Sequence, residues 1–183
     1  VGATCEEHWL HDFEWLMGIN FWGVVYGCKF FLPLLRRAEE AHIVNISSVF
    51  GIVGMPMNSS YCASKFAVRG LSECLRAELA DSPIGVTSVH PGGVATNIVA
   101  SARFVEPEGL SGVHERAKRA FERMLPPERA AEAIVRGVER NRARVLITRE
   151  AYVIDAAKRL MPVLSGELVG KRWRAQLRRL LGN

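Results

Sequence analysis

Residues 42–48 read HIVNISS, residues 60–80 read SYCASKFAVRGLSECLRAELA, and residues 84–90 read IGVTSVH. The first stretch is interpreted as a short buried strand, and the third as a second strand that ends at the PGG sequence at 91–93. The longer stretch between them predicts a helix, and the DSP sequence at 81–83 stops it. A strand, a helix and a second strand in this order predict a crossover connection and a parallel sheet.

The same alternation continues on both sides of this unit. A long apolar helix is expected over 12–37, before the first strand. A further helix over 127–141 leads to a third strand over 143–148, and the helical segments 150–161 and 166–181 follow. The chain is therefore predicted to have an α/β fold with about three strands. That is a thin sheet, because a complete doubly wound sheet usually has about five or more strands.

The composition is that of a globular protein. The chain has 183 residues, of which 49% are hydrophobic and 23% charged, which excludes disordered and low-complexity classes. No uninterrupted apolar run reaches the roughly 18 residues typical of a membrane span, so no spanning helix is expected. The four cysteines form no CxxC pair. They predict reduced thiols in a cytoplasmic protein, and no metal site is expected.

Charge divides the chain into two parts. The net charge is +5, and the whole excess lies in residues 151–183, because residues 1–150 carry equal numbers of basic and acidic side chains. The neutral body is not expected to bind nucleic acid. We expect the basic C-terminal helix either to lie on an anionic membrane surface or to pack as an ordinary surface helix.

Tyr61 and Lys65 lie four residues apart on the predicted helix 60–80, so they share one face. Tyrosine is a poor base at neutral pH, and a nearby ammonium group favours the phenolate and lowers the pKa. The pair is a sensible device for proton transfer. Such a pair also occurs on the exposed face of ordinary helices.

Two strand ends supply further polar groups. Ser48 ends the first strand, and ligands of open α/β sheets bind at the carboxyl ends of strands. Its hydroxyl could bind a substrate oxygen, or it could cap a turn. The segment 90–96 (HPGGVAT) follows the second strand and brings a turn, backbone amides and a hydroxyl to the same edge. Its alternative interpretation is a plain strand-ending turn.

Together these segments resemble the classical short-chain dehydrogenase/reductase family over residues 10–150. The matching motifs are N-I-S-S-x-x-G at 45–51, Y-x-x-S-K at 61–65, P-G-x-V-x-T at 91–96 and N-x-x-G at 20–23. The resemblance implies an oxidoreductase that transfers a hydride between NAD or NADP and a carbonyl or secondary alcohol of an apolar small molecule. It also implies a homo-oligomer, in which the helix 12–37 and the Tyr61 helix commonly form a dimer bundle.

The resemblance also implies residue roles. Tyr61 would be the acid/base, Ser48 would hold the substrate carbonyl, and Asn20 would support a water-linked proton relay. Lys65 would lower the pKa of Tyr61 and bind the nicotinamide ribose. The residues expected to contact the cofactor are Tyr61, Lys65, Pro91, Gly92, Val94 and Thr96. His90 is expected to be a strand-end residue, and Asn45 to hold backbone rather than substrate.

The sequence departs from the family at its beginning. The family starts with a βαβ unit carrying T-G-x-x-x-G-x-G and later has N-N-A-G, and neither motif occurs here. Residues 1–150 are therefore interpreted as an N-terminally truncated, partial Rossmann-like domain, the C-terminal part of a doubly wound parallel sheet, and residues 151–183 as a basic helical extension. Without a phosphate cradle, cofactor binding by this chain is expected to be weak or absent. The alternative is a non-catalytic fragment that serves as a dimerisation or membrane-surface module.

Two apolar sets are candidates for the substrate site, and packing is the alternative role for both. The first set follows Ser48 and comprises Val49, Ile52, Val53, Met55 and Met57. The second set comprises Val99, Phe104, Val105 and Leu110.

Overall fold

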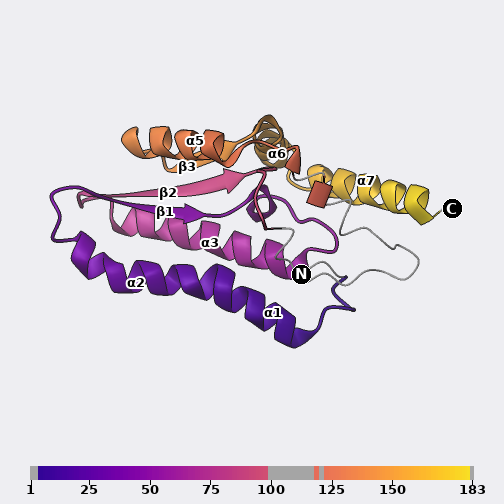
Figure 1. Ribbon diagram of the computed structural model, residues 1–183, viewed down its shortest axis with the longest axis horizontal. Helices are drawn as coiled ribbons and strands as arrows, with labels where there is room; N and C mark the ends of the chain where they lie inside the picture. The colour runs from indigo at the N-terminus through magenta and orange to yellow at the C-terminus, as the bar shows by residue number, and fades with distance from the viewer. Residues whose placement is uncertain (1–3, 99–117, 120–121, 182–183) are drawn as a thin grey trace.

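The structure, a computed structural model, describes residues 4–98, 118–119 and 122–181 (Figure 1). Its elements are α1 (Leu10–Met17), a π-helical turn (Gly18–Trp22), α2 (Gly23–Leu35), β1 (Ala41–Ile46), a 3-10 turn (Val49–Gly51), α3 (Ser59–Glu78), β2 (Ile84–Pro91), α5 (Pro127–Glu139), β3 (Arg144–Ile147), α6 (Arg149–Leu160) and α7 (Leu164–Leu181). Each predicted strand and helix is present, with ends that differ by a few residues.

The strands form a parallel three-stranded sheet in the order β1-β2-β3. Ile43 pairs with Val86, and Ser88 pairs with Arg144. The predicted α/β, Rossmann-like fold class is confirmed. Because all three strands run the same way, their carboxyl ends meet at one edge, and the candidate site residues after β1 and β2 lie there.

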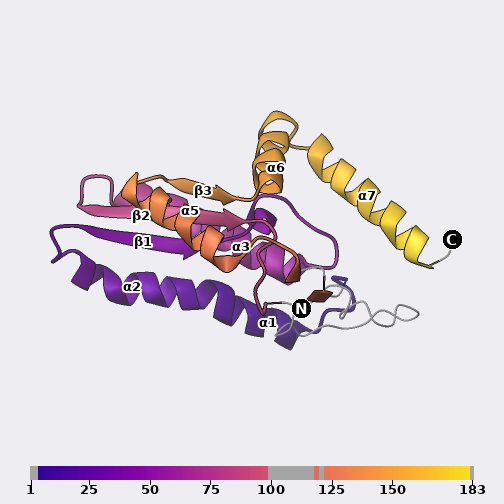
Figure 2. The ribbon, with the colours of Figure 1, turned by 45° about the horizontal axis from the view of Figure 1, so that its top comes forward.

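The sheet is covered on both faces (Figure 2). Side chains alternate along a strand, so neighbouring residues face opposite sides. Ile43 and Val86 face a core shared with α2 and α3, which includes Cys28 and Leu75. Val89 and its neighbours face a second core, which is closed by α5 and includes the buried residues Val89, Ala130, Val145 and Ile147. Because the sheet is covered on both faces, β2 is buried along nearly its whole length, including its polar residues Thr87, Ser88 and His90.

The first helix differs from the prediction of one uninterrupted helix. A π-helical turn separates α1 from α2 and contains Asn20. Such turns insert one extra residue and are frequent at functional sites. The segment Leu10–Leu35 is long enough, and with a mean hydropathy of 1.3 apolar enough, to cross a membrane. The sequence analysis did not predict such a helix. Core helices that meet the same criterion are mostly buried, whereas the most apolar window of this segment is 0% buried, although the segment contacts α3 and β1.

The basic segment has two parts. α6 packs against β3, with Ala151 fully buried and Asp155 paired with Arg144. α7 contacts α6 and extends away from the sheet in both views (Figures 1 and 2). The division of the chain at residue 150 stays a prediction.

Gly51 tests how tightly β1 is held against α3. A Cβ at this position would overlap the Ser47 hydroxyl and the Lys65 carbonyl group, whereas a Cβ at Gly54 would meet nothing within 4 Å. We expect Gly51→Ala to lower the free energy of unfolding by about 2 kcal/mol, because the backbone must move to relieve the overlap. Gly54→Ala is the control and should change it far less. Denaturant unfolding followed by circular dichroism measures both, and equal effects would contradict this packing.

Candidate active site

Three polar side chains meet where β1 ends and α3 begins. Ser48 lies just after β1, and Tyr61 and Lys65 lie one turn apart in the first half of α3. The Ser48 side chain lies near enough to the Tyr61 hydroxyl to act on the Tyr61 pKa, and Nζ of Lys65 lies 5.6 Å from the centre of the Tyr61 ring. The structure therefore brings together the three residues that the sequence singled out at this edge.

Ser48 is held by the residues around it. The backbone N–H of Ser47 donates to Val89 at 2.8 Å, which continues the pairing of β1 with β2 beyond the strand. The Ser47 hydroxyl donates to the Lys65 carbonyl at 2.8 Å and ties the strand end to α3. The Ser48 hydroxyl accepts from the N–H of Phe50 at 3.1 Å. The sequence analysis did not single out Ser47, which lies one residue before the candidate itself.

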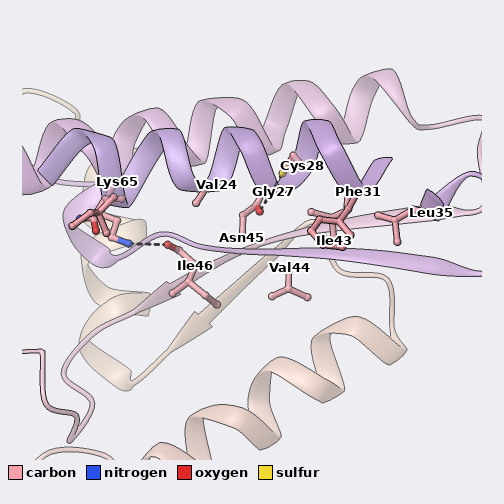
Figure 3. A pocket seen from close by; sticks show the side chains of 12 residues that line it. Val24, Gly27, Cys28, Phe31, Leu35, Ile43, Val44, Asn45, Ile46 and Lys65 are labelled. Carbon is pink, nitrogen blue, oxygen red and sulfur yellow. Dashed lines mark hydrogen bonds between the residues drawn. The ribbon is translucent and has the colours of Figure 1, made fainter. Parts of the chain in front are cut away.

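The electrostatics of Tyr61 differ from the expectation. Burial raises the pKa of Tyr61, and the hydrogen bond from Ser48 only partly opposes that rise. Burial also lowers the pKa of Lys65. Nζ of Lys65 donates to the Ile46 carbonyl at 3.0 Å (Figure 3). In this structure the Lys65 ammonium donates to a backbone carbonyl, and the pKa of Tyr61 is raised rather than lowered.

Asn20 connects the π-helical turn to α3. Its Nδ2 donates to the Ser64 hydroxyl at 3.2 Å, and that hydroxyl donates to the Tyr61 carbonyl at 2.8 Å. Ser64 is fully buried, so it is a fixed link between Asn20 and the backbone of Tyr61. Asn20 and Lys65 also line the same groove beside β1. A role of Asn20 in a water-linked relay stays a prediction.

The segment after β2 lies along the neighbouring strand end. Pro91 pairs with Ile147 at the end of β2, and the N–H of Gly92 donates to Ile147 at 2.9 Å. A Cβ at Gly92 would overlap the side chains of Thr148 and Glu150, so this position needs glycine. Val94 forms an isolated bridge with Leu125, and Thr96 is exposed. Contact of Pro91, Gly92, Val94 and Thr96 with a nicotinamide stays a prediction.

The apolar candidates for the substrate site separate into two groups. Val49, Ile52 and Val53 are buried in the body of the protein, which favours their alternative role in packing. Met55 and Met57 are half-buried near the start of α3. The second predicted set, Val99, Phe104, Val105 and Leu110, lies outside the described residues.

Asn45 and His90 are both buried and hold structure in different ways. Asn45 donates to the Ser72 hydroxyl at 3.0 Å and accepts a 3.6 Å hydrogen bond from the Cys28 thiol, so it links α2 and α3 to the sheet. Nδ1 of His90 lies 3.0 Å from the Ser48 carbonyl, and Nε2 lies 3.0 Å from the Ser88 hydroxyl. A carbonyl only accepts, so Nδ1 carries the proton and Nε2 of the neutral ring accepts from Ser88. Sequence analysis placed His90 at a strand end but missed this contact with the backbone of Ser48.

The geometry defines a class of protein: a parallel α/β sheet with serine, tyrosine and lysine gathered at its carboxyl edge. A family model described as short chain dehydrogenase matches residues 2–106. The chain belongs to the short-chain dehydrogenase family. The resemblance stated from the motifs is thereby confirmed.

Relatives and solved structures agree with this assignment. The chain is 43% identical over 155 residues to the oxidoreductase SadH of Mycobacterium tuberculosis, an alignment that covers 82% of this chain and 55% of SadH. A short-chain dehydrogenase/reductase of Burkholderia phymatum in complex with NAD has a TM-score of 0.79 and 25% identity, covering 89% of this chain and 63% of that one. A short-chain dehydrogenase of Burkholderia cenocepacia in complex with NADP shows the same fold, with a TM-score of 0.71 and 22% identity, covering 93% of this chain and 67% of that one. The chain thus spans about half the length of its curated relative SadH.

His90 should make stability depend on pH. Burial lowers its pKa to about 4, whereas an unfolded histidine titrates near 6.5. As pH falls from 7 to 4, the unfolded state takes up a proton before the folded state does, so the free energy of unfolding should fall by on the order of 3 kcal/mol from this residue.

Denaturant unfolding at pH 7 and pH 4.5 measures this loss. His90→Gln should be less stable than the parent at pH 7 but should lose less stability on acidification. The matched control is His11→Gln, because His11 is exposed, and it should keep the parent's pH dependence. The same acid loss in the parent and in His90→Gln would contradict the assignment.

Proposed function

We propose that this chain carries the catalytic half of an NAD- or NADP-dependent oxidoreductase. The reaction would move a hydride between the nicotinamide and a carbonyl or secondary alcohol of an apolar small molecule. The observation that carries the proposal is the placement of Ser48, Tyr61 and Lys65 together at the carboxyl end of β1, with the Lys65 ammonium 5.6 Å from the centre of the Tyr61 ring. We further propose that the protein acts in the cytoplasm.

Each residue has a role that follows from its position. In the reduction direction, the hydroxyls of Ser48 and Tyr61 hydrogen-bond the substrate carbonyl, and Tyr61 gives its proton to the developing alkoxide. Burial keeps Tyr61 protonated at neutral pH, as an acid in this direction must be. Asn20 lies on the groove that Lys65 also lines, which supports its proposed part in returning a proton to Tyr61.

The residues present fit the nicotinamide end of the cofactor. The bound nicotinamide would supply or accept the hydride. Nζ of Lys65 has three protons and donates one of them to Ile46, so it retains donors for ribose hydroxyls, and the Tyr61 hydroxyl lies on the same face of α3. The sequence contains no Gly-rich phosphate turn to hold the pyrophosphate.

The open side of β1 supports an incomplete cofactor site. β1 is the edge strand of the described sheet, and a groove of about 460 Å³ runs between it and α2 (Figure 3). Its lining includes the apolar side chains of Val24, Phe31, Leu35 and Ile43. An apolar strand edge beside an apolar helix face is a surface that further chain normally covers.

We also propose a homo-oligomer. The ring of Trp22, at the end of the π-helical turn, stacks with Tyr26 and Phe30 of α2, with successive centroids 5.7 and 6.1 Å apart. These three side chains are 48–68% exposed. These rings lie on the side of the helix opposite the groove, so a second copy of the chain would cover them in the proposed homo-oligomer. A non-catalytic role as a dimerisation module rests on this same face.

Removing the Tyr61 hydroxyl tests the enzymatic proposal. In the full-length protein, Tyr61→Phe should lower kcat about 100-fold or more, because the proton donor is lost. Tyr152→Phe is the control, since Tyr152 is exposed on α6, and it should leave kcat unchanged. Activity is followed by nicotinamide absorbance with medium-chain alcohols and ketones. Turnover of Tyr61→Phe equal to that of the control would remove Tyr61 from the mechanism.

Cofactor binding by the 183-residue chain is a separate prediction. We expect titration with NADH or NADPH, followed by fluorescence, to show a Kd of about 1 mM or weaker, because the phosphate cradle supplies much of the affinity. Lys65→Met should weaken any binding that remains. Micromolar affinity in the parent chain would show that the described half holds the cofactor without that cradle.

A further inference from the structure

The corner between α6 and α7 presents apolar and basic side chains to solvent together. Leu160 and Val163 are 80% and 72% exposed, and Leu164 and Leu168 are 46% and 44% exposed. Lys171 and Arg172, about one turn further along α7, are exposed cations. We call this set the corner surface; it comprises Leu160, Val163, Leu164, Leu168, Lys171 and Arg172.

The two sides of α7 differ in burial. Ser165 is buried and its N–H donates to the Met161 carbonyl, while Gly166 and Val169 are half-buried. A Cβ on Gly166 would lie 3.8 Å from Nζ of Lys158, so this side faces α6. Leu164 and Leu168 lie one turn apart on the exposed flank next to this packed side, and Lys171 and Arg172 follow one turn further along α7.

The connection to α6 holds this arrangement in place. Nζ of Lys158 donates to the Pro162 carbonyl at 2.6 Å, which closes the turn between the helices. From that turn α7 runs away from the sheet in both ribbon views (Figures 1 and 2). The corner surface therefore projects from the body, where a flat partner can reach it.

Charge identifies the kind of partner. The whole net charge of +5 arises in residues 151–183, and α7 carries one acidic residue, Glu167, against Lys171, Arg172, Arg174, Arg178 and Arg179. A second copy of this chain carries the same net charge of +5, so the overall electrostatic force between two copies is repulsive. Nucleic acid would use the cations but leave the exposed leucines in water.

We propose that the corner surface docks on a membrane rich in anionic phospholipids. Leu160, Val163, Leu164 and Leu168 enter the boundary between headgroups and acyl chains, and Lys171 and Arg172 contact lipid phosphates. The catalytic edge of the sheet is not part of this surface, so docking is independent of the oxidoreductase reaction.

Co-sedimentation of the full 183-residue chain with vesicles tests the proposal. Binding is expected to vesicles of phosphatidylcholine and phosphatidylglycerol in a two-to-one ratio, and to be at least about tenfold weaker to phosphatidylcholine alone. Reversing two cations, Lys171→Glu with Arg172→Glu, should lower affinity for the anionic vesicles at least about tenfold.

The matched control reverses two cations elsewhere. Arg129→Glu with Arg136→Glu on α5 changes the net charge equally, and both residues are exposed. This control should lose less than about threefold, because charges beyond the Debye length of about 10 Å are screened. Leu164→Ser with Leu168→Ser tests the apolar contribution and should also weaken binding, while circular dichroism reports whether the helix content is kept.

Four results would overturn the proposal. They are no binding of the parent chain to anionic vesicles, equal binding to neutral vesicles, equal losses in the two charge-reversed variants, and unchanged binding of the leucine variant. The last result would indicate a site for polyanions in general. If the leucine variant instead removes self-association in sedimentation while vesicle binding persists, the corner surface is a protein interface and the membrane proposal is wrong.

Discussion

The candidate site depends on how the end of β1 is clamped between α3 and β2. The Ser47 hydroxyl holds the Lys65 carbonyl on one side, and the His90 ring holds the Ser48 carbonyl on the other. Gly51 permits the close approach, since any side chain there would enter the same contact. Ser48 and Tyr61 come from different elements, so they lie close together only because this strand end is fixed against the first turns of α3.

A second constraint comes from α2, which is apolar on opposite faces. One face, including Val24 and Phe31, lines the groove beside β1, and the other carries the stacked rings of Trp22, Tyr26 and Phe30. A helix that is apolar all round is normally buried on all sides. Its own domain leaves both faces partly exposed. The described residues thus leave apolar surface of this segment uncovered both along the edge of the sheet and on its outer face.

The sequence predicted the elements well because apolar length and turn residues determine them locally. It predicted three parallel strands, and it placed Ser48, Tyr61 and Lys65 at one edge, since a parallel sheet collects the carboxyl ends of its strands. The π-helical turn at Asn20 was missed because the segment around it is apolar on all sides, so the one-residue shift of register breaks no visible pattern. The His90–Ser48 contact was missed because it joins residues 42 positions apart through a backbone carbonyl, which no side-chain motif records.

Ser48, Tyr61 and Lys65 come together as predicted, but the pKa of Tyr61 shifts in the direction opposite to the predicted one. A buried phenolate and a buried ammonium stabilise each other only when the charges face one another at short range. Here burial opposes ionisation of both groups, and the ammonium of Lys65 serves the Ile46 carbonyl at the open edge of β1. The described half therefore supplies an acid that stays protonated. The Lys65 ammonium keeps two further N–H donors besides the one it gives to Ile46, so a group placed at the β1 edge can bind it without breaking that hydrogen bond.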